Sequence, residues 1–437
     1  MQKEKQNLME KIIALCKRRG FIYPGSEIYG GLAGIYDYGP LGVEFKNNLK
    51  KAWREEMFRK QTDIFEVDSS ILMQRRVWDA SGHTSAGFTD PLQECKKCHH
   101  RFRADHLIET GIKKCPDCGG QLTESKKFNL LVETHLGSVK DESGLTYLRG
   151  ETTQGIYVNY RNVKTTMRAE LPFGIGQIGK AFRNEITPGH FIYRMREFEQ
   201  MEQQYFIYPE EADKYFDFWK KERMRWYLNL GMKEEHLRFR PHAKDELAHY
   251  ARAAEDIEYH FPFGWHEIEG IHNRGDWDLS RHSQFSGEDL SEMDEKTGKK
   301  FYPYIIETSA GADRLTLAFL IDAYNDEEKD HLVLQLHPHL ASYKAAVFPL
   351  LANKPQLVEK AQSIYQNLKK DFIVAWDARG NIGKRYYAQD EIGTPFCVTV
   401  DFDSLEKNDV TVRDRDSMEQ KRVKIPELKA YFQEKFL

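Results

Sequence analysis

Four cysteines arranged in two C-x-x-C pairs constrain this chain more than any other feature of its sequence. Cys95 and Cys98 form the first pair, and after 16 residues Cys115 and Cys118 form the second. Two such pairs can bring four thiolates to the corners of a tetrahedron, which is the geometry of a structural Zn²⁺ site. The glycine that follows Cys118 permits the tight turn that such a site needs.

The composition of the surrounding segment, about residues 89–127, favours zinc over the alternatives. This segment is rich in Cys, Lys and His and poor in large aliphatic residues, so it has little material for a core. Redox pairs or disulfides would not explain two such pairs in a coreless insertion. We therefore expect a zinc-ribbon-like insertion whose four thiolates leave no open position for catalysis. His99 and His100 are expected to lie beside the metal without binding it.

The charge balance excludes two simple classes of protein. The chain has 437 residues, with 64 Lys and Arg against 68 Asp and Glu, a formal charge of −4. It is therefore neither a polybasic nucleic-acid coat nor an acidic disordered tail. A nucleic-acid partner is still allowed, because such binding requires a basic face and not a basic total. At about 150 residues per domain, the length suggests two or three domains.

The sequence has no segment close to the roughly 20 consecutive apolar residues of a membrane-spanning helix. Its first residues predict an amphipathic helix and not a signal peptide. Six cysteines in a chain of this length are not a secreted disulfide scaffold. We expect a cytoplasmic protein without membrane association, in which Cys16 and Cys397 are buried, inert thiols.

Hydrophobic patterning divides the rest of the chain into two parts. From about residue 128 to 320, short alternating runs such as YFIY predict an antiparallel sheet with helices packed on it. After a charged linker at 326–331, the runs HLVLQL, AAVFPL, DFIVAWD and CVTVDFD predict buried strands of a compact α/β domain, with a helix at 354–368. Residues 332–437 hold 16 Lys and Arg against 14 Asp and Glu, a small basic excess that suits a phosphate-bearing partner.

Residues 182–206 predict a β-hairpin that carries several arginines. Turn-forming residues at 187–189 separate two strand-like halves. Alternation places Arg183 and Glu185 on one face of the first strand. The same alternation groups five residues on one face of the second strand: Arg194, Arg196, Phe198, Gln200 and Glu202. Surface ion pairs are the simple alternative, but converging guanidinium groups beside an aromatic ring suit the phosphates and base of a nucleotide.

A third motif, IETSAGADR at residues 306–314, opens an apolar helix. A strand ending in Glu307 and Ser309, then a helix with Arg314 in its first turn, can aim a carboxylate and a guanidinium into one cleft. Helix capping by Ser and Asp is the alternative explanation.

Together these motifs resemble class II aminoacyl-tRNA synthetases. The sequence at 182–185 is similar to the second signature motif of that class, and that at 311–314 to the third. The blocks IYDYGPLGVEFKNNLKKAWREEMF, LRGETTQGIYVNY, HFPFGWHEIEGI and DEIGTPFCVTVDF extend the resemblance, from about residue 20 onward, to dimeric glycyl-tRNA synthetases. The resemblance implies a homodimer that joins glycine to tRNA(Gly) with ATP, glycyl-adenylate being the intermediate.

The resemblance also implies an architecture of a class II antiparallel catalytic sheet with flanking helices and a C-terminal α/β domain. The expected segments are a first catalytic part at 1–88, the zinc insertion at 89–127, a second catalytic part at 128–330 and an anticodon-binding domain at 331–437. A helix from Pro40 carries an i, i+4 stripe of apolar residues. The stripe consists of Phe45, Leu49, Trp53 and Met57. Core packing explains it simply, whereas the family implies a dimer-interface helix.

For ATP, the resemblance makes Arg183 the α-phosphate ligand and Arg314 the γ-phosphate ligand, and these two are the expected catalytic residues. Phe198 would stack on adenine, and Glu185 would accept a hydrogen bond from the adenine amino group. Glu267 would help to bind ATP through its Mg²⁺ ions. The full set implied for ATP is Arg183, Asn184, Glu185, Tyr193, Arg194, Arg196, Phe198, Glu267, Ile268, Gly311, Asp313 and Arg314.

For glycine, selectivity must come from gripping the ammonium group and leaving no room beyond Cα, so no editing domain is needed. The resemblance points Glu151, Glu202 and Glu307 at the amino group, with Ser309 beside them. The full set implied for glycine is Arg103, Glu151, Phe198, Gln200, Glu202, Glu307, Ser309 and Gly311. Gly150, Thr308 and the pair at 189–190 depart from the family's usual residues.

Other polar residues receive simpler interpretations. Asp276, Asp278 and His282 are expected to be turn formers in a polar loop. Arg413 and Arg415 suit either RNA contacts or structural contacts. The segment HAKDELAH, at 242–249, lacks the spacing of a zinc protease, so no metal is expected there.

Two rival functions differ in sequence features. A class II synthetase for serine, threonine or proline would share the hairpin but not three carboxylates around a site without a side-chain recess. A synthetase-like accessory protein that only binds RNA or a polymerase would lack the ATP-binding arginines.

Overall fold

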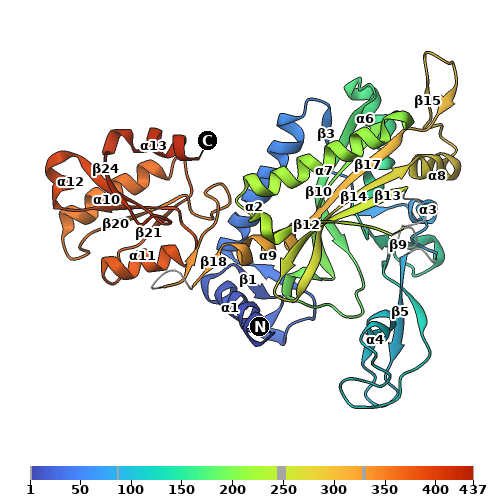
Figure 1. Cartoon of the computed structure of the whole chain (residues 1–437), viewed down its shortest axis with the longest axis horizontal. Coiled ribbons are helices and arrows are strands. Elements are labelled where there is room, and N and C mark those ends of the chain that lie inside the picture. Colours follow the sequence, from blue (N-terminus) through green and yellow to red (C-terminus); the bar gives the residue numbers. More distant parts are fainter. Residues whose placement is uncertain (1, 86–87, 244–251, 327–330, 437) are drawn as a thin grey trace.

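The computed structural model describes residues 2–85, 88–243, 252–326 and 331–436 of the chain. Figure 1 shows a large body built on one sheet, a separate α/β domain formed by the C-terminal residues, and a narrow projection that contains the four cysteines. Most of the predicted linker at 326–331 lies outside the described residues. Within the described ranges, no helix combines the length and the apolar character needed to cross a membrane.

A seven-stranded sheet forms the centre of the large body. Its order is β12-β13-β14-β17-β11-β10-β3, and all neighbours are antiparallel except β3 and β10, which confirms the predicted antiparallel sheet. Its strands are β3 (Ile64–Glu66), β10 (Phe173–Phe182), β11 (Glu197–Ile207), β12 (Leu237–Pro241), β13 (Ala253–Phe261), β14 (Gly264–Gly275) and β17 (Tyr304–Gly311).

Alternation along the strands gives the sheet two different faces. Ile306 packs in a core with α2 (Pro40–Arg54), α7 (Ala212–Asn229) and α9 (Ala312–Asp322). Its neighbour Ile305 packs on the opposite face. The helices around that second face are α5 (Thr153–Tyr157), α6 (Tyr160–Met167) and α8 (Trp277–Ser286). Glu307 and Ser309 share the face of Ile305, so the predicted site residues of β17 lie on the second face.

The predicted apolar stripe of the helix from Pro40 packs inside the chain. Phe45, Leu49, Trp53 and Met57 are all fully buried in a single copy, so core packing accounts for them. Met57 lies in the π-helical continuation of α2, Glu55–Lys60. Any dimer contact of this helix must use other residues.

The N-terminal segment forms the predicted amphipathic helix, α1 (Gln2–Arg19), in which Ile12 and Leu15 are buried. A short antiparallel pair follows: β1 (Ile22–Pro24) and β2 (Tyr36–Tyr38). Arg19 donates to the carbonyl of Ala388 at 2.6 Å, which ties this helix to the C-terminal domain.

The projection is a small three-stranded sheet that extends from the large body. Its order is β6-β5-β7, formed by β5 (Thr89–Glu94), β6 (Arg101–Arg103) and β7 (Lys126–Asn129), with helix α4 (Ala104–Glu109). At its base lie α3 (Arg75–Ala80), β4 (Leu72–Met73), β8 (Val132–His135) and β9 (Leu145–Leu148). Trp78, Leu131 and Tyr147 form an apolar cluster at that base.

The C-terminal domain contains a five-stranded sheet with its own apolar core. Strands β21 (Val374–Trp376), β20 (Ala345–Pro349) and β22 (Phe396–Val400) are parallel, and β23 (Asp409–Asp414) and β24 (Gln420–Lys424) add antiparallel neighbours. The helices are α10 (Pro355–Leu368), α11 (Ile382–Asp390), α12 (Phe402–Lys407) and α13 (Leu428–Lys435). These elements confirm the predicted α/β domain.

One predicted strand of this domain was misplaced. The run HLVLQL contributes only β19 (Val333–Leu334), which pairs with β18 (Tyr324–Asn325) outside the five-stranded sheet. A further short hairpin, β15 (Glu292–Met293) with β16 (Lys300–Phe301), extends from the large body.

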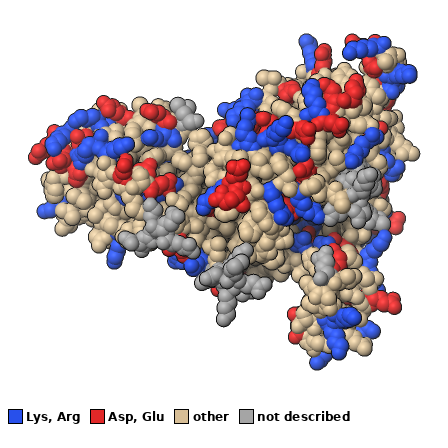
Figure 2. Space-filling model, viewed as in Figure 1, with Lys and Arg blue, Asp and Glu red and all other residues tan. Residues whose placement is uncertain are grey.

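Figure 2 shows Lys and Arg interspersed with Asp and Glu over the face in view.

Candidate functional site

A cavity of about 210 Å³ lies on the second face of the large sheet. Two neighbouring strands supply facing wall residues, because the register sets Gln200 of β11 opposite Gly311 of β17. The same register sets Glu202 opposite Ser309. The cavity gathers these predicted residues: Glu151, Arg183, Glu185, Tyr193, Arg194, Phe198, Gln200, Glu267, Glu307, Ser309, Gly311, Asp313 and Arg314.

The predicted hairpin forms with a longer loop than its turn residues indicated. Strands β10 and β11 pair from Phe182 to Glu197, so Arg183, Glu185 and Arg194 lie in the connecting loop. A 3₁₀ turn at Phe191–Tyr193 folds this loop over the cavity. Strand alternation therefore places Phe198 correctly but does not govern the loop residues.

One end of the cavity carries guanidinium groups stacked on rings. The Arg183 guanidinium lies 5.2 Å from the ring centre of Phe88 and 5.4 Å from that of Phe198, and its Nε donates to the Gly150 carbonyl at 3.0 Å. Among the described residues, no carboxylate lies within ion-pair distance of the Arg183 guanidinium, whose side chain contacts the two rings and the Gly150 carbonyl. Such an arrangement fits a bound phosphate.

The second arginine of this end is Arg314. It lies 4.5 Å from the ring centre of Tyr193, and its Nη1 lies 3.0 Å from Oε2 of Glu267. Burial opposes the ionised form of Glu267, but Arg314 and His272 outweigh it and hold the pKa of Glu267 below its ordinary value. Glu185 is buried nearby, and one of its carboxylate oxygens has no hydrogen-bond donor among the described residues.

The other end of the cavity carries carboxylates held by a buried network. Glu307 accepts hydrogen bonds from Gln204 at 2.7 Å, from Arg274 at 3.0 Å and from Nδ1 of His272 at 2.6 Å. Burial alone would raise its pKa, but Arg274 and His272 lower it to about 2. Glu151 is also ionised at neutral pH, because His83 and Arg274 overcome its burial and hold its pKa well below the usual range.

Glu202 lies behind this wall and not in it. It is fully buried, and it accepts hydrogen bonds from Thr152 at 2.5 Å, from Gln204 at 2.7 Å and from Thr153. Burial and the nearby charges of Glu307 and Glu151 raise the pKa of Glu202 to about 8. Of the three predicted carboxylates, two are therefore held ionised by cationic neighbours, whereas burial and like charge favour a proton on the third.

Sequence reasoning missed the cation of this network. Arg274 is 3% exposed and forms a two-point ion pair with Asp278, at 2.8 and 2.9 Å, while it also binds Glu307. Gly270, His272 and Arg274 alternate along β14 and all line the cavity, so a period-two search of GIHNRG could have found them. Thr153, Ile192 and Met195 are further wall residues that were not predicted.

The interpretation of 276–282 as a polar turn was wrong. Helix α8 begins at Trp277, and both Asp278 and His282 are buried on it. Nε2 of His282 donates a hydrogen bond to Oε1 of Gln154 at 2.8 Å. The polar side chains of this segment bind residues that line or adjoin the cavity: Asp278 pairs with Arg274, and His282 bonds to Gln154.

Besides Glu202, four predicted residues lie outside the described wall of the cavity. Arg196 donates to the carbonyls of Glu185 and Ala33 and so braces the loop. Arg103 pairs with Asp90 at 3.1 Å and with Asp105 at 2.6 Å, inside the projection. The other two are Asn184, whose backbone N–H donates to Leu130, and Ile268, which is buried in the core.

Asp313 lines the cavity but also has a structural role. Its carboxylate accepts hydrogen bonds from the Tyr38 hydroxyl at 2.5 Å and from the backbone N–H of Glu199 at 2.7 Å. It caps no helix through its side chain, since the residue before α9 is Gly311. Asp313 instead joins α9 to β11 and β2.

In the segment at 242–249, His242 pairs with Asp256 at 2.7 Å, and Glu246 and His249 lie outside the described residues.

The four cysteines converge at the tip of the projection. Their sulfur atoms all lie within 4.8 Å of one another, with Cys95 3.5 Å from Cys118 and Cys98 3.6 Å from Cys115. All four thiols are free. A tetrahedron with Zn–S bonds of about 2.3 Å has S···S edges of about 3.8 Å, so the cluster has the dimensions of a zinc site.

The backbone around the cluster supports the same conclusion. Backbone N–H groups of Lys97 and Cys98 point at the Cys95 sulfur, at 3.4 and 3.5 Å. A Cβ on Gly120 would lie 2.9 Å from that sulfur, so the turn accepts only glycine there. His99 and His100 pair with Glu94 and Asp117 outside the cluster.

The two arginines of the C-terminal domain have structural partners. Arg413 forms a two-point ion pair with the fully buried Asp390, both distances being 2.9 Å. Arg415 is 2% exposed and donates to the carbonyls of Gly393 and Leu336. Of the two predicted roles, the structural one therefore applies. Cys16 and Cys397 are buried thiols whose pKa values burial raises.

Comparison with known families matches both parts of the chain. Residues 138–324 match the tRNA synthetase class II core domain (G, H, P, S and T), and residues 344–435 match an anticodon binding domain. The first match contains most of the cavity, and the second coincides with the five-stranded C-terminal domain.

Curated relatives extend the match over nearly the whole chain. The chain is 52% identical to the glycine–tRNA ligase of Caldanaerobacter subterraneus subsp. tengcongensis and 51% identical to that of Geobacillus kaustophilus, each over 98% of both chains. It is 53% identical to the glycine–tRNA ligase of Treponema denticola, over 96% of this chain and 95% of the relative. With this identity and coverage, the chain belongs to the glycyl-tRNA synthetase family of class II.

Proposed function

We propose that this chain is a glycine–tRNA ligase that forms glycyl-adenylate from glycine and ATP and transfers the glycyl group to the 3′ end of tRNA(Gly). The observation that carries the proposal is a single cavity whose wall brings together ionised carboxylates and guanidinium groups. Ionised Glu151 and Glu307 suit an ammonium group, and Arg183 and Arg314 suit the phosphates of ATP.

In the first step, a glycine carboxylate oxygen attacks the α-phosphorus of ATP. The bond between that phosphorus and the bridging oxygen breaks, and pyrophosphate leaves. The step needs no side-chain nucleophile, because placing the reactants and neutralising charge supply the rate enhancement. Arg183 would bind the α-phosphate and Arg314 the γ-phosphate. Phe198 would stack on adenine, and the unpartnered oxygen of Glu185 would accept a hydrogen bond from the adenine amino group.

Glycine has no side chain to recognise, so the site must grip its ammonium group and exclude larger side chains. Glu151 and Glu307 would bind the ammonium, with Ser309 beside them. Burial and two ionised neighbours raise the pKa of Glu202 behind this wall, which favours a proton there and limits the negative charge that the buried site must hold. A bulkier amino acid is excluded by size, and no editing domain is required.

In the second step, a ribose hydroxyl at the 3′ end of the tRNA attacks the activated carbonyl carbon, and AMP leaves. We infer that the C-terminal domain, at 331–437, contacts the anticodon, that the catalytic part comprises 1–88 and 128–330, and that 89–127 is the zinc insertion. We also infer a cytoplasmic homodimer, as the family resemblance implies.

Two metals fit residues of this chain. The four thiolates match Zn²⁺ in number, spacing and chemistry, and such a closed site would hold the projection folded without taking part in the reaction. Glu267 has an ionised carboxylate at the guanidinium end, the kind of oxygen ligand that Mg²⁺ accompanying ATP accepts. When bound, Mg²⁺ supplies charge neutralisation for the phosphates.

Amino-acid-dependent exchange of pyrophosphate into ATP tests the proposal. We expect exchange with glycine and less than about one hundredth of that rate with alanine or serine, since both carry an atom beyond Cα. Faster exchange with serine, threonine or proline would identify another class II specificity. Absence of exchange with all twenty amino acids would indicate an accessory protein.

A further inference from the structure

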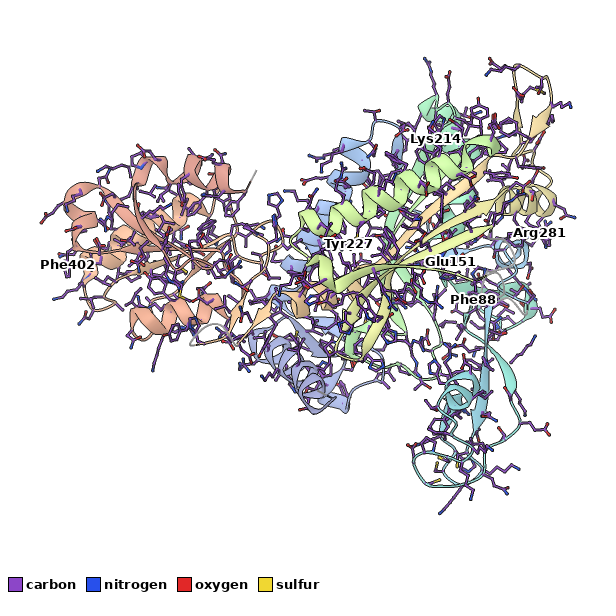
Figure 3. All side chains as sticks on the ribbon, viewed as in Figure 1. Phe88, Glu151, Lys214, Tyr227, Arg281 and Phe402 are labelled. Carbon is purple, nitrogen blue, oxygen red and sulfur yellow. The ribbon has the colours of Figure 1, made fainter. Side chains whose placement is uncertain are left out.

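His83 joins the base of the projection to the carboxylate end of the cavity. Its imidazole is 10% exposed and lies between two rings, with its centre 5.2 Å from that of Trp78 and 4.5 Å from that of Phe88. Its backbone carbonyl accepts a hydrogen bond from Nδ2 of Asn129 at 2.8 Å. The ring is therefore held in one orientation. Figure 3 shows Phe88 and Glu151 at this junction between the projection and the large body.

The two ring nitrogens of His83 face different partners. Nδ1 lies 2.7 Å from the Ser81 hydroxyl, and Nε2 lies 3.4 Å from Oε2 of Glu151. A carboxylate oxygen accepts hydrogen bonds and does not donate them, so the form of His83 with its N–H on Nε2 suits this contact. The Ser81 hydroxyl can donate to Nδ1, or it can accept from Nδ1 while donating to the Trp78 carbonyl at 3.2 Å. Both arrangements are compatible with Nε2–H pointing at Glu151.

Both oxygens of Glu151 are thereby held. Oε1 accepts a hydrogen bond from Nε2 of Gln154 at 2.8 Å, and Oε1 of Gln154 in turn lies 2.8 Å from Nε2 of His282. Oε2 faces His83. A hydrogen bond from Gln154 and the close approach of His83 each restrain one oxygen of the carboxylate, which reduces the ordering cost when a cation binds.

We propose that His83 is a positioning residue for the amino-acid substrate: its Nε2–H orients Glu151 to receive the ammonium group of glycine. This inference rests on the proposed function. It predicts a much larger effect on glycine than on ATP, because His83 faces Glu151 directly and reaches Arg183 only through the ring of Phe88. Glycine has no side chain to bind, so a misaligned Glu151 carboxylate would weaken one of the few contacts that recognise it.

Substitution of His83, with Michaelis constants measured separately for glycine and ATP in pyrophosphate exchange, tests the proposal. His83→Leu keeps the volume and removes the donor. Removing a hydrogen bond to a charged group should raise KM for glycine about ten- to hundredfold, with KM for ATP changed less than about twofold. His83→Gln retains an N–H donor and should restore KM for glycine to within about threefold of wild type. His135→Leu, at an exposed histidine of β8, is the matched control and should change neither constant.

The outcomes separate positioning from a general structural role. Equal rises in both Michaelis constants, an unchanged KM for glycine, or a His83→Gln enzyme as impaired as His83→Leu would overturn the proposal. If His83→Leu does not fold, His83→Gln together with Ser81→Ala decides, since loss of the Ser81 hydroxyl should still raise only KM for glycine. A wild-type enzyme without glycine-dependent exchange would overturn the proposed function itself. Normal wild-type exchange with an unaffected variant would overturn the role of His83 alone.

Discussion

The two ends of the cavity present different charged groups and are built in different ways. The carboxylate end stands on strands and a loop, with Glu307 on β17, its partner Arg274 on β14 and Glu151 in the loop before α5, and its carboxylates accept hydrogen bonds from buried donors. The guanidinium end stands on a loop and a helix start, with Arg183 after β10 and Arg314 in the first turn of α9. Its arginines are held mainly by rings and backbone carbonyls.

This difference suits the two ligands that the ends would bind. Glycine is small and presents one ammonium group, so its ligands must be fixed in place before it arrives. ATP is large and presents many oxygens, so guanidinium groups stacked on rings can keep their N–H groups available. Buried hydrogen-bond donors thus hold the groups that need the most exact placement. Variants should therefore affect one substrate and spare the other.

The largest effect is expected from Arg183→Gln. It removes the guanidinium that would neutralise the α-phosphate, so kcat for adenylate formation should fall about 10²–10³-fold. KM for glycine should stay within about twofold of wild type. Arg101→Gln, at an exposed arginine of the projection, is the control and should be unchanged. An equal loss of glycine affinity in Arg183→Gln would show that the two ends do not act separately.

Glu151→Gln should produce the corresponding effect at the other end. The amide keeps the shape of the side chain but loses the charge, so KM for glycine should rise about 10–10²-fold. KM for ATP should not change, as measured by pyrophosphate exchange at varied ATP. Glu133→Gln, at an exposed position on β8, controls for a general change in charge. A rise in KM for ATP alone would show that Glu151 serves ATP binding and not glycine binding.

Loss of the cysteine cluster should affect both ends together. Cys115→Ser should lose one zinc ion per chain by elemental analysis and make the projection sensitive to protease. Because the base of the projection contacts Arg183 through Phe88 and Glu151 through His83, both Michaelis constants should rise, by about tenfold at most. A metal-free wild-type protein with a protease-resistant projection and normal kinetics would contradict both the zinc site and this coupling.

The smallest effect concerns the pH dependence of stability at Glu202. Its pKa is about 8 in the folded chain against 4.5 in the ordinary state. Between these values the folded state keeps a proton that the unfolded state loses, so the free energy of unfolding falls as pH rises, by at most about 1.4 kcal/mol per pH unit. Glu202→Gln should remove this slope, as measured by urea unfolding from pH 5 to 8. Parallel pH profiles for the two proteins would show that Glu202 is ionised in the fold.

Local patterns in the sequence were enough to predict several parts of this molecule. The spacing of the four cysteines predicted their convergence, because each pair closes within a few residues of turn. Alternation predicted the antiparallel sheet and the position of Phe198. The conformation of the hairpin loop could not be predicted in this way, since a 3₁₀ turn at Phe191–Tyr193 interrupts the two-residue alternation of a strand.

Buried polar groups were the other source of error. Asp278 and Arg274 pair across a strand–helix junction, and a polar segment that faces inward has the same composition as an exposed turn. Arg413 and Arg415 were left between RNA and structure for the same reason, because the carboxylate and carbonyls that hold them come from distant segments. Contacts of this kind depend on tertiary structure.

A structure of the chain with a non-hydrolysable analogue of glycyl-adenylate tests the central claim most directly. The account predicts that the amino nitrogen lies about 3 Å from carboxylate oxygens of both Glu151 and Glu307, while the phosphate contacts Arg183. An analogue bound in the reverse direction, or with its amino group away from these carboxylates, would contradict it.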